Sequence, residues 1–569
     1  MPDNNAPPER HLRFILVTLL TFCVFFLLFV FRYADDNRLT SWRWAFAHVN
    51  PAEFIPLIFA GIFIVYGLLR FPFTGRNPAP FLFVSSFAAS SAFWGSPETI
   101  VDVSRYFTQA KHLEMYGARY FLTEWGRTIN AWTDLPLVPF LYGVIFRVFG
   151  EARVYIQIFT GLLFAGTTVL TYLTGRRLWD KHTGFFAGLM LLGIPYIFSQ
   201  TPLMLVDVPT MFFLSLSVYA FIRALDTGGP WIAASSAAVS CAVFSKYSTW
   251  MMLSVLAVVF IVCLRRGTGG TARVCTGRAV VAAVLAAVLA GIPALLKFDV
   301  ILDQIRFLRE YQVPGLKRWG ESFVSTFLFQ VHPFITAAGL YSVYAAFKKR
   351  DPRFPVAGWL VFLVVLLQIR RSRYVLVVFP MLTLMASFGL QAVRDMELRK
   401  YIVSCIVASS LVTAVFAYLP LLQEMAPVNL KNAGRFLNSA DVEKAVVFTL
   451  PSGDTAVNQA VSVPVLDLFT DKAVYYDYDP ALSPPPEKTE TSPLRFTWEY
   501  RNPRYYYAGE ASAGENAAVA VISNGIPRSM PGRIERRLNG YRKAAVFSVS
   551  TGLFGYRPVV TVYLPEDRL

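Results

Sequence analysis

The chain has 569 residues, of which 55% are hydrophobic and only 16% are charged, and its formal net charge is +16. A soluble chain usually carries about 25% charged residues, so this composition excludes an ordinary soluble protein and indicates a membrane protein. The basic excess does not indicate nucleic-acid binding, because Lys and Arg cluster in short loops between apolar runs. The five cysteines lie in or beside apolar segments without metal-type spacing, so they indicate neither a disulfide framework nor a zinc site.

Long apolar runs recur along most of the chain and predict a polytopic α-helical membrane protein with about thirteen spans. The first run is too long for a signal peptide and has no small-residue cleavage site after it, so we expect it to remain as an anchor. The predicted spans lie near residues 12–31, 54–70, 78–95, 153–174, 183–200, 209–224, 231–245, 248–264, 279–296, 332–347, 355–370, 374–393 and 401–421.

The charges of the connecting loops predict the orientation of these spans. With Arg10 and Arg13 inside, every later inner loop contains Arg or Lys, as the positive-inside rule requires. The extracytoplasmic face then holds the long loop 96–152, the turn at Lys246, the turn 370–373 and all residues after 422. The sequence therefore predicts a protein of the cell or inner membrane whose C-terminus is outside.

The composition changes along the chain and predicts three parts. Residues 1–77 form an N-terminal tail with two additional helices, 78–422 a transmembrane module, and 423–569 a small extracytoplasmic α/β domain. In the last part, strands are expected at Lys444–Leu450, Ala473–Tyr478, Ala517–Ser523 and Val559–Leu564.

The outer loop 96–152 contains apolar residues and a short helical run. The run Pro136–Phe149 is too short for a span, which fits a re-entrant or interfacial helix on the membrane surface. Before it, Asp102, Arg105 and Tyr106 share one face of a helix by their spacing. An exposed Asp–Arg pair at this spacing contributes only a few tenths of a kcal/mol, so these residues are either a wet ion pair or part of a site.

Two further charges lie at the ends of predicted spans on the same face. Asp207 stands in the apolar stretch L-M-L-V-D-V-P, where a carboxylate needs a wet cavity or a partner; it also fits a helix N-cap before Pro209. Lys246 stands in a turn between two apolar runs. Its ammonium can reach lipid phosphate by snorkelling, and it would equally suit a bound lipid-phosphate substrate.

An arginine-rich turn completes the set. Three arginines, Arg370, Arg371 and Arg373, lie in a short outer turn against the positive-inside trend. Guanidinium groups match phosphate oxygens, so the turn is either an anchor for anionic lipid or a substrate phosphate site. Gly-rich phosphate loops and nucleophile elbows are absent from the sequence. Together the charges indicate a lipid-linked phosphate donor and a general base on one face of the membrane.

Six short motifs, taken in chain order, resemble the GT-C fold of membrane glycosyltransferases, in particular the group of protein O-mannosyltransferases and the aminoarabinose transferase ArnT. The resemblance covers roughly residues 78–395. The motifs are D-V-S-R-Y (102–106), T-D-L-P (133–136) before a helix ending in F-G, G-R-R-L-W (175–179), V-D-V-P (206–209), S-K-Y (245–247) and R-Y-V-L (373–376).

The resemblance implies transfer of a sugar from a polyprenyl-phosphate donor to an acceptor hydroxyl, with inversion. It makes Asp102 the general base, with Asp207 and Glu98 orienting the acceptor or tuning Asp102. The donor phosphate would be held by Arg105, Tyr106, Lys246, Arg371 and Arg373. Asp134 and Tyr374 would position the loop or the acceptor.

This scheme needs no cofactor and no metal, although two carboxylates leave room for a divalent cation. The expected partners are the donor lipid, an acceptor protein, lipid or glycan, and the bilayer, without nucleic acid. The alternative is a non-catalytic protein that binds or transports lipid phosphate with the same cations. The sequence leaves open the donor sugar, the prenyl length, the acceptor, the oligomeric state and the role of the C-terminal domain.

Overall fold

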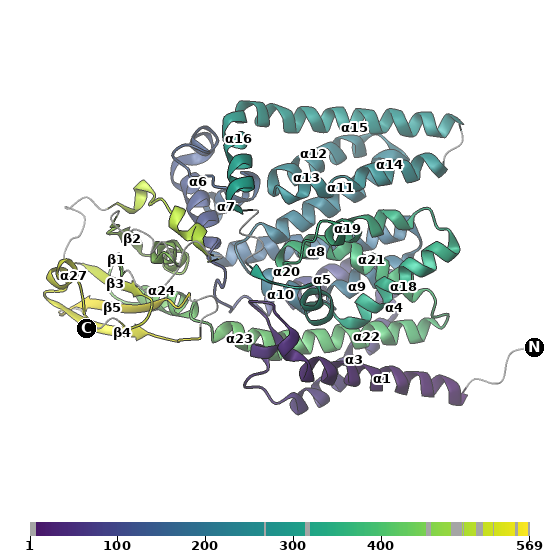
Figure 1. The fold of residues 1–569 in the computed structure, drawn as a ribbon, viewed down its shortest axis with the longest axis horizontal. Coiled ribbons are helices and arrows are strands. Elements are labelled where there is room, and N and C mark those ends of the chain that lie inside the picture. The colour runs from purple at the N-terminus through teal and green to yellow at the C-terminus, as the bar shows by residue number, and fades with distance from the viewer. Residues whose placement is uncertain are drawn as a thin grey trace, which may run out of the picture.

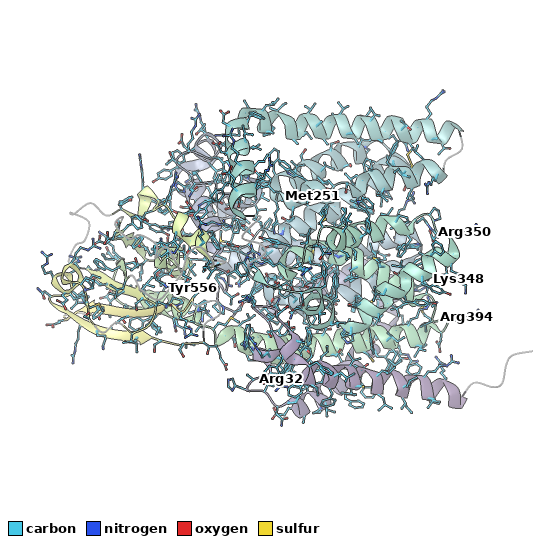
Figure 2. All side chains as sticks on the ribbon, in the orientation of Figure 1. Arg32, Met251, Lys348, Arg350, Arg394 and Tyr556 are labelled. Atoms are coloured by element: carbon cyan, nitrogen blue, oxygen red, sulfur yellow. A yellow bond between two sulfur atoms is a disulfide. The ribbon has the colours of Figure 1, made fainter. Side chains whose placement is uncertain are left out.

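The protein is described by a computed structural model that covers residues 7–266, 269–312, 319–450, 457–479, 492, 494–507, 516–526, 529–551 and 556–566. Figure 1 shows long helices running side by side, with a small sheet domain attached at one end of the bundle. Lys348, Arg350 and Arg394 lie at the opposite end of the bundle from this sheet (Figure 2). The predicted separation of basic inner loops from the C-terminal domain is therefore present in the fold.

The helical part runs from α1 to α23. Its first elements are α1 (Pro7–Val30), η1 (Arg32–Ala34), α2 (Trp42–Ala45), η2 (Pro51–Glu53), α3 (Phe54–Arg70), α4 (Pro72–Arg76) and α5 (Pro78–Ser91). The middle elements are α6 (Val103–Glu124), α7 (Leu137–Phe149), α8 (Arg153–Leu178), α9 (Lys181–Leu191), α10 (Pro195–Gln200), α11 (Asp207–Thr227), α12 (Pro230–Ser245), α13 (Ser248–Met252), α14 (Val255–Arg266), α15 (Gly269–Leu296), α16 (Phe298–Phe307) and η3 (Leu308–Gln312). The last elements are η5 (Ser325–Gln330), α18 (Pro333–Lys349), α19 (Phe354–Leu366), α20 (Ser372–Val375), η6 (Leu376–Val378), α21 (Phe379–Leu390), α22 (Met396–Thr413), η7 (Ala414–Tyr418) and α23 (Leu419–Gln423).

The apolar helices confirm an integral membrane protein. Within the described residues, eight helices are long and apolar enough to cross a bilayer, and three shorter apolar helices accompany them. All thirteen predicted spans fall on helical segments, but the number that cross the membrane stays a prediction. The most apolar window of Ser372–Leu390 is 94% buried and that of Gly270–Leu296 only 11%, so α21 is central and α15 is peripheral.

The outer loop folds into two helices at the sheet end of the bundle. α6 bends at Gly117, whose φ of 82° lies in the left-handed region that favours glycine. α7 packs against α6, with Tyr142 and Phe146 fully buried between them and the bundle. The short helix predicted at Pro136–Phe149 is therefore present, and its position relative to the membrane surface stays a prediction.

The C-terminal part is a five-stranded mixed sheet with helices. Its strands are β1 (Lys444–Thr449), β2 (Ala473–Tyr476), β3 (Ala517–Ser523), β4 (Tyr541–Phe547) and β5 (Val559–Pro565), in the order β2-β1-β3-β5-β4. β1 pairs in parallel with β2 and β3, whereas β5 pairs antiparallel with β3 and β4. The helical elements are α24 (Val428–Ser439), η8 (Gln459–Val461), α25 (Ser462–Asp467), η9 (Arg495–Glu499), η10 (Arg504–Tyr506) and α27 (Gly532–Arg537).

Four of these strands were predicted from the sequence. β4 was not, because its side chains are mostly half-exposed and its sequence, Y-R-K-A-A-V-F, carries charges at the strand start. The α/β character of the domain is confirmed, while the boundaries at residues 78 and 423 stay predictions.

Buried contacts fix the sheet domain to the outer loops. Val101 and Trp319 join the apolar core of the sheet domain. The Lys111 ammonium on α6 donates to Asp467 Oδ2 on α25 at 2.6 Å and to Glu151 Oε1 at 3.0 Å. The sheet domain therefore packs directly against the loop that carries Asp102.

One expectation about the cysteines is wrong. Cys263 on α14 and Cys275 on α15 form a disulfide, with their Cα atoms 6.9 Å apart. The two helices form a hairpin, which brings together cysteines that stand 12 residues apart in the sequence.

Candidate active site

A cavity of about 510 Å³ lies where the sheet domain meets the bundle. Its walls come from the outer loop, the bundle and the sheet domain, and Met251 and Tyr556, which both line it, mark its bundle and sheet sides in Figure 2. The predicted site residues that line it are Asp102, Arg105, Tyr106, Asp134, Lys246, Arg371, Arg373 and Tyr374. Eight of the ten predicted positions therefore converge on one cavity.

Arg373 joins two carboxylates at the base of this cavity. Its Nε donates to Asp207 Oδ2 at 2.6 Å, and its NH1 donates to Asp102 Oδ2. Lys246 Nζ donates to the other oxygen of Asp207 at 2.6 Å. Asp207 itself is 1% exposed and does not line the cavity, so it lies behind Arg373 and Lys246 and orients both cations. The guanidinium group occupies the point where the two carboxylates meet.

Arg105 bridges Asp102 to a third carboxylate. Its NH2 lies 3.4 Å from Asp102 Oδ1 and 3.3 Å from Asp134 Oδ1. The amide of Gln109, one turn further along α6, donates to Asp134 Oδ2 at 3.2 Å. The buried Nε of Arg105 has no hydrogen-bond partner among the described residues. Arg105 thus links Asp102 and Asp134 at the wall of the cavity, while its Nε–H group is buried.

The pKa values of the two carboxylates that Arg105 joins are shifted in opposite directions. Burial opposes the ionisation of Asp102, but Arg373 and Arg105 outweigh it and hold its pKa well below the usual range. Burial raises the pKa of Asp134, and the single guanidinium of Arg105 does not compensate fully. Asp102 is therefore ionised at neutral pH.

Aromatic rings frame the cationic side chains. Lys246 Nζ lies 4.3 Å from the ring centre of Tyr374, and the Arg371 guanidinium lies 3.6 Å from that of Trp319. On the other side, Arg105 lies 5.3 Å from the ring centres of both Trp132 and Phe496. These contacts hold the cations by cation–π attraction without consuming all their hydrogen-bond donors.

Tyr106 is fully buried beside this cluster. It lines the cavity, and its ring lies 5.6 Å from the Arg105 guanidinium. Burial and the neighbouring Asp134 raise the pKa of its hydroxyl well above the usual value, so the side chain stays neutral.

Glu98 lies apart from the cavity. Its Oε1 accepts a hydrogen bond of 2.6 Å from Arg153 Nε, and its Oε2 accepts one of 3.3 Å from the Met204 amide. The other guanidinium nitrogens of Arg153 bind the carbonyl oxygens of Trp94 and Pro202. The structure thus does not bring Glu98 to Asp102, because the chain turns between them and directs Glu98 towards α8.

Several residues that line the cavity were missed in the sequence. They are Arg38, Trp132, Trp319, Glu321, Arg495 and Phe496. Trp132 has a backbone φ of 48°, which is rare for a bulky residue and often found at functional sites. This signal is visible in the structure and not in the sequence. Arg495 and Phe496 belong to η9, so the C-terminal domain supplies part of the wall.

The lining carries more positive than negative charge. Six cations line the cavity, Arg38, Arg105, Lys246, Arg371, Arg373 and Arg495, against the three carboxylates Asp102, Asp134 and Glu321. Such an excess favours an anionic ligand. Within the described residues, no three His, Cys, Asp or Glu side chains are placed to hold a metal ion.

Comparisons with known proteins bear on this arrangement. Residues 134–296 match the family model described as dolichyl-phosphate-mannose-protein mannosyltransferase. The crystal structure of apo ArnT from Cupriavidus metallidurans aligns with a TM-score of 0.53 and 13% identity over 86% of this chain and 98% of that chain. The same ArnT bound to undecaprenyl phosphate aligns with a TM-score of 0.52 and 14% identity, with equal coverage.

The archaeal oligosaccharyltransferase AglB from Archaeoglobus fulgidus, in complex with an inhibitory peptide and a dolichol-phosphate, aligns with a TM-score of 0.46 and 11% identity over 79% of this chain and 70% of that chain. A search of curated protein sequences finds no match. The resemblance that the six motifs indicated is confirmed by the family match and by the shared fold: the chain has the GT-C fold in the form seen in ArnT.

Proposed function

We propose that the protein is a membrane glycosyltransferase that moves a sugar from a polyprenyl-phosphate donor to an acceptor hydroxyl, with inversion. The observation that carries this proposal is the convergence of Asp102 and Asp207 on Arg373 at a cavity rich in cations. The fold shared with an ArnT that binds undecaprenyl phosphate, and the mannosyltransferase family match, support it.

The donor phosphate would bind among Lys246, Arg371, Arg373 and Arg105. These groups are already held in place by carboxylates and aromatic rings, so little reorganisation accompanies binding. As the bond between the anomeric carbon and the phosphate oxygen breaks, the same cations neutralise the charge that develops on the departing polyprenyl phosphate.

Asp102 would accept the proton of the acceptor hydroxyl as its oxygen attacks the anomeric carbon from the face opposite the phosphate. A carboxylate paired with two guanidinium groups is a weak base in the free enzyme. The negative charge of a phosphate bound beside Arg373 and Arg105 would partly offset these cations and so raise the basicity of Asp102 without displacing them. The donor thereby helps to activate the base.

The remaining predicted residues would act by positioning. Asp207 orients Arg373 and Lys246, Asp134 orients Arg105, and the Tyr374 ring supports Lys246. Glu98 takes no part in this scheme because Arg153 holds it away from the cavity.

We also propose that the cavity faces the extracytoplasmic side. The exposed basic residues Lys348 and Arg350 lie at the end of the bundle opposite the sheet domain (Figure 2). Because the positive-inside rule places such residues in the cytoplasm, the sheet domain and the cavity would lie outside.

The decisive experiment supplies the purified protein in lipid nanodiscs with polyprenyl-phosphate-linked sugars and with a cell-envelope extract as the source of acceptor hydroxyls, and measures the polyprenyl phosphate released. Asp102→Asn should lower transfer at least about 100-fold, because the carboxylate base is lost. The variant should still fold and bind undecaprenyl phosphate. Asp303→Asn is the matched control, since Asp303 is exposed on α16 and, among the described residues, forms an ion pair with Arg306 alone. Mass analysis of glycans and lipids from a deletion strain would identify the sugar and the acceptor.

Two outcomes would contradict the proposal. Transfer by Asp102→Asn at near the wild-type rate would remove Asp102 as the base. Binding of undecaprenyl phosphate by the wild type without transfer of any sugar would instead favour a protein that binds or transports lipid phosphate.

A further inference from the structure

We infer that an N-terminal segment, residues 35–42, holds the phosphate-binding arginine turn in position. This segment lies between the first two long helices, α1 and α3, and is called the strap below. It acts through another segment, residues 319–330, which is called the wall segment. The inference rests on the proposed function, because it concerns how the donor-phosphate site is kept in shape. The strap residues are positioning residues, with the exception that Arg38 and Leu39 also line the cavity.

The strap is organised by two buried side chains of its own. Asp35 accepts hydrogen bonds from the backbone amides of Asn37 at 3.0 Å and Trp42 at 2.8 Å. Asn37 Oδ1 accepts from the backbone amides of Leu39 at 2.9 Å and Thr40 at 2.8 Å. These bonds fix a compact turn that directs Asp35 and Thr40 towards the wall segment.

The strap is bonded to the wall segment along its whole length. Asp35 also accepts from Ser325 Oγ and, at 3.0 Å, from Gln330 Nε2. Thr40 Oγ1 donates to Gln330 Oε1 at 2.7 Å. Asp35, Thr40, Ser325 and Gln330 are at most 2% exposed. A buried network whose polar groups are hydrogen-bonded to one another strongly favours a single arrangement of the strap against the wall segment.

The start of the wall segment is held as well. Asp36 Oδ1 accepts from the Ser322 amide at 3.0 Å, and Arg38 Nε donates to the Trp319 carbonyl at 3.1 Å. The indole ring of Trp319 is the surface on which the Arg371 guanidinium lies. The strap therefore fixes the ring that supports Arg371.

The wall segment in turn fixes the backbone of the arginine turn. Glu321 Oε2 accepts from the Ser372 amide at 2.8 Å, and Thr326 Oγ1 shares a hydrogen bond of 2.7 Å with Ser372 Oγ. Ser372 stands between Arg371 and Arg373, and its side chain is fully buried. Through these bonds the strap determines where both guanidinium groups point.

The chain offers a matched pair of substitutions that tests this inference. Thr40→Val removes one hydroxyl that joins the N-terminal region to the bundle, and Thr18→Val removes another, because Thr18 Oγ1 shares a 2.6 Å hydrogen bond with Tyr401 on α22. Both changes preserve side-chain shape. Only Thr40 belongs to the strap. A general loosening of the N-terminal helices would therefore affect both variants, whereas mispositioning of the arginine turn would affect Thr40→Val alone.

The expected result separates binding from chemistry. In Thr40→Val, the affinity for undecaprenyl phosphate should fall about tenfold, equivalent to about 1.4 kcal/mol. The KM for the donor should rise similarly, with kcat changed less than about threefold, because the arginines bind the phosphate before and during the reaction. Thr18→Val should behave as the wild type, and Thr40→Ser, which keeps the hydroxyl, should restore affinity.

Hydrogen–deuterium exchange provides a readout that does not depend on the donor. Thr40→Val should speed exchange in residues 319–330 and 370–374, whereas Thr18→Val should not. Unchanged exchange at 370–374, or equal loss of affinity in both Val variants, would overturn the inference. If Thr40→Val does not fold, Asp36→Ala removes a half-buried link to Ser322 and carries the same expectations. A wild type that binds no undecaprenyl phosphate would contradict the proposed function, while the exchange experiment would still decide the strap.

Discussion

Glu98 and Asp102, four residues apart at the start of the outer loop, each pair with guanidinium groups, and the two ion pairs have different roles. Glu98 and Arg153 form a sealed pair in which the guanidinium is occupied by Glu98 and two backbone carbonyls. Asp102 lies at the cavity between Arg373 and Arg105. The Glu98 side chain is fully buried, whereas that of Asp102 is 14% exposed. Burial raises the pKa of Glu98, whereas two cations lower that of Asp102.

The difference shows that burial of an ion pair does not by itself mark a site. What distinguishes Asp102 is that it lines the cavity together with its partners Arg105 and Arg373, whereas neither Glu98 nor Arg153 is among the lining residues. Arg153 binds fixed groups in the protein. The first pair joins α8 to the loop, and the second is available to a ligand.

The largest expected effect follows from breaking the sealed pair. Arg153→Met should lower the free energy of unfolding by about 3 to 5 kcal/mol, because Glu98 would be left buried without a counter-charge. Chemical unfolding in detergent, followed by circular dichroism, measures this loss. Transfer per folded molecule should stay within about twofold of the wild type.

The double variant Glu98→Gln with Arg153→Met sharpens this test. It removes the uncompensated charge, so it should recover much of the lost stability. A fall in transfer per folded molecule as large as that of Asp102→Asn would show that Glu98 acts in the reaction after all.

A smaller effect, on transfer activity, is expected from changing the cluster of Asp102, Asp207 and Arg373 at the cavity. Arg373→Lys keeps the positive charge. It removes the planar guanidinium group that donates to both Asp207 and Asp102 and puts a single ammonium group in its place. We expect kcat/KM to fall about 100-fold, as for the loss of one donor that stabilises a transition state. Arg370→Lys is the control, because Arg370 is exposed and bonds Gln368 outside the cavity. A loss of less than about threefold in Arg373→Lys would contradict the assignment.

The sequence predicted the membrane helices and much of the site because both depend on local signals. Apolar run length predicts helices directly. Asp207 stood out because a carboxylate within an apolar stretch is rare. Lys246 and Arg373 stood out because they lie in turns on the outer face, against the positive-inside trend. Their common face followed from loop charge alone. The C-terminal strands followed from β-branched runs, except β4, whose pattern is mixed.

The rest of the site depends on contacts between segments far apart in the chain. Glu98 precedes Asp102 by about one helical turn, so the sequence suggested that they act together, but the backbone between them is not helical and the two diverge. Trp319 and Glu321 carry no local signal, and they matter only because the strap and the arginine turn meet around them. Contacts between distant segments produce no periodic pattern in the sequence, so sequence analysis does not detect them.

The smallest effect concerns the third carboxylate of the cluster and depends on pH. Asp102 has a pKa below its usual range, so in the free enzyme it stays ionised at every pH above about 4. Asp134 has a raised pKa, so as the pH falls it takes up a proton before Asp102 does and releases Arg105 from one of its two carboxylates. Of the two carboxylates that Arg105 joins, Asp134 is therefore the one expected to cause an acidic loss of kcat/KM.

We expect kcat/KM of the wild type to be lower at pH 5.5 than at pH 7.5, because the raised pKa of Asp134 makes it the first carboxylate of the cluster to take up a proton. Asp134→Asn should have a lower rate at both pH values, because Arg105 loses a charged partner, but it should show no such decline with acid. Initial rates at low donor concentration across this range measure both. If the decline persists in Asp134→Asn, the titrating group is another one: the free donor, Asp102, or one of the buried carboxylates Asp35 and Glu321, whose pKa values burial also raises.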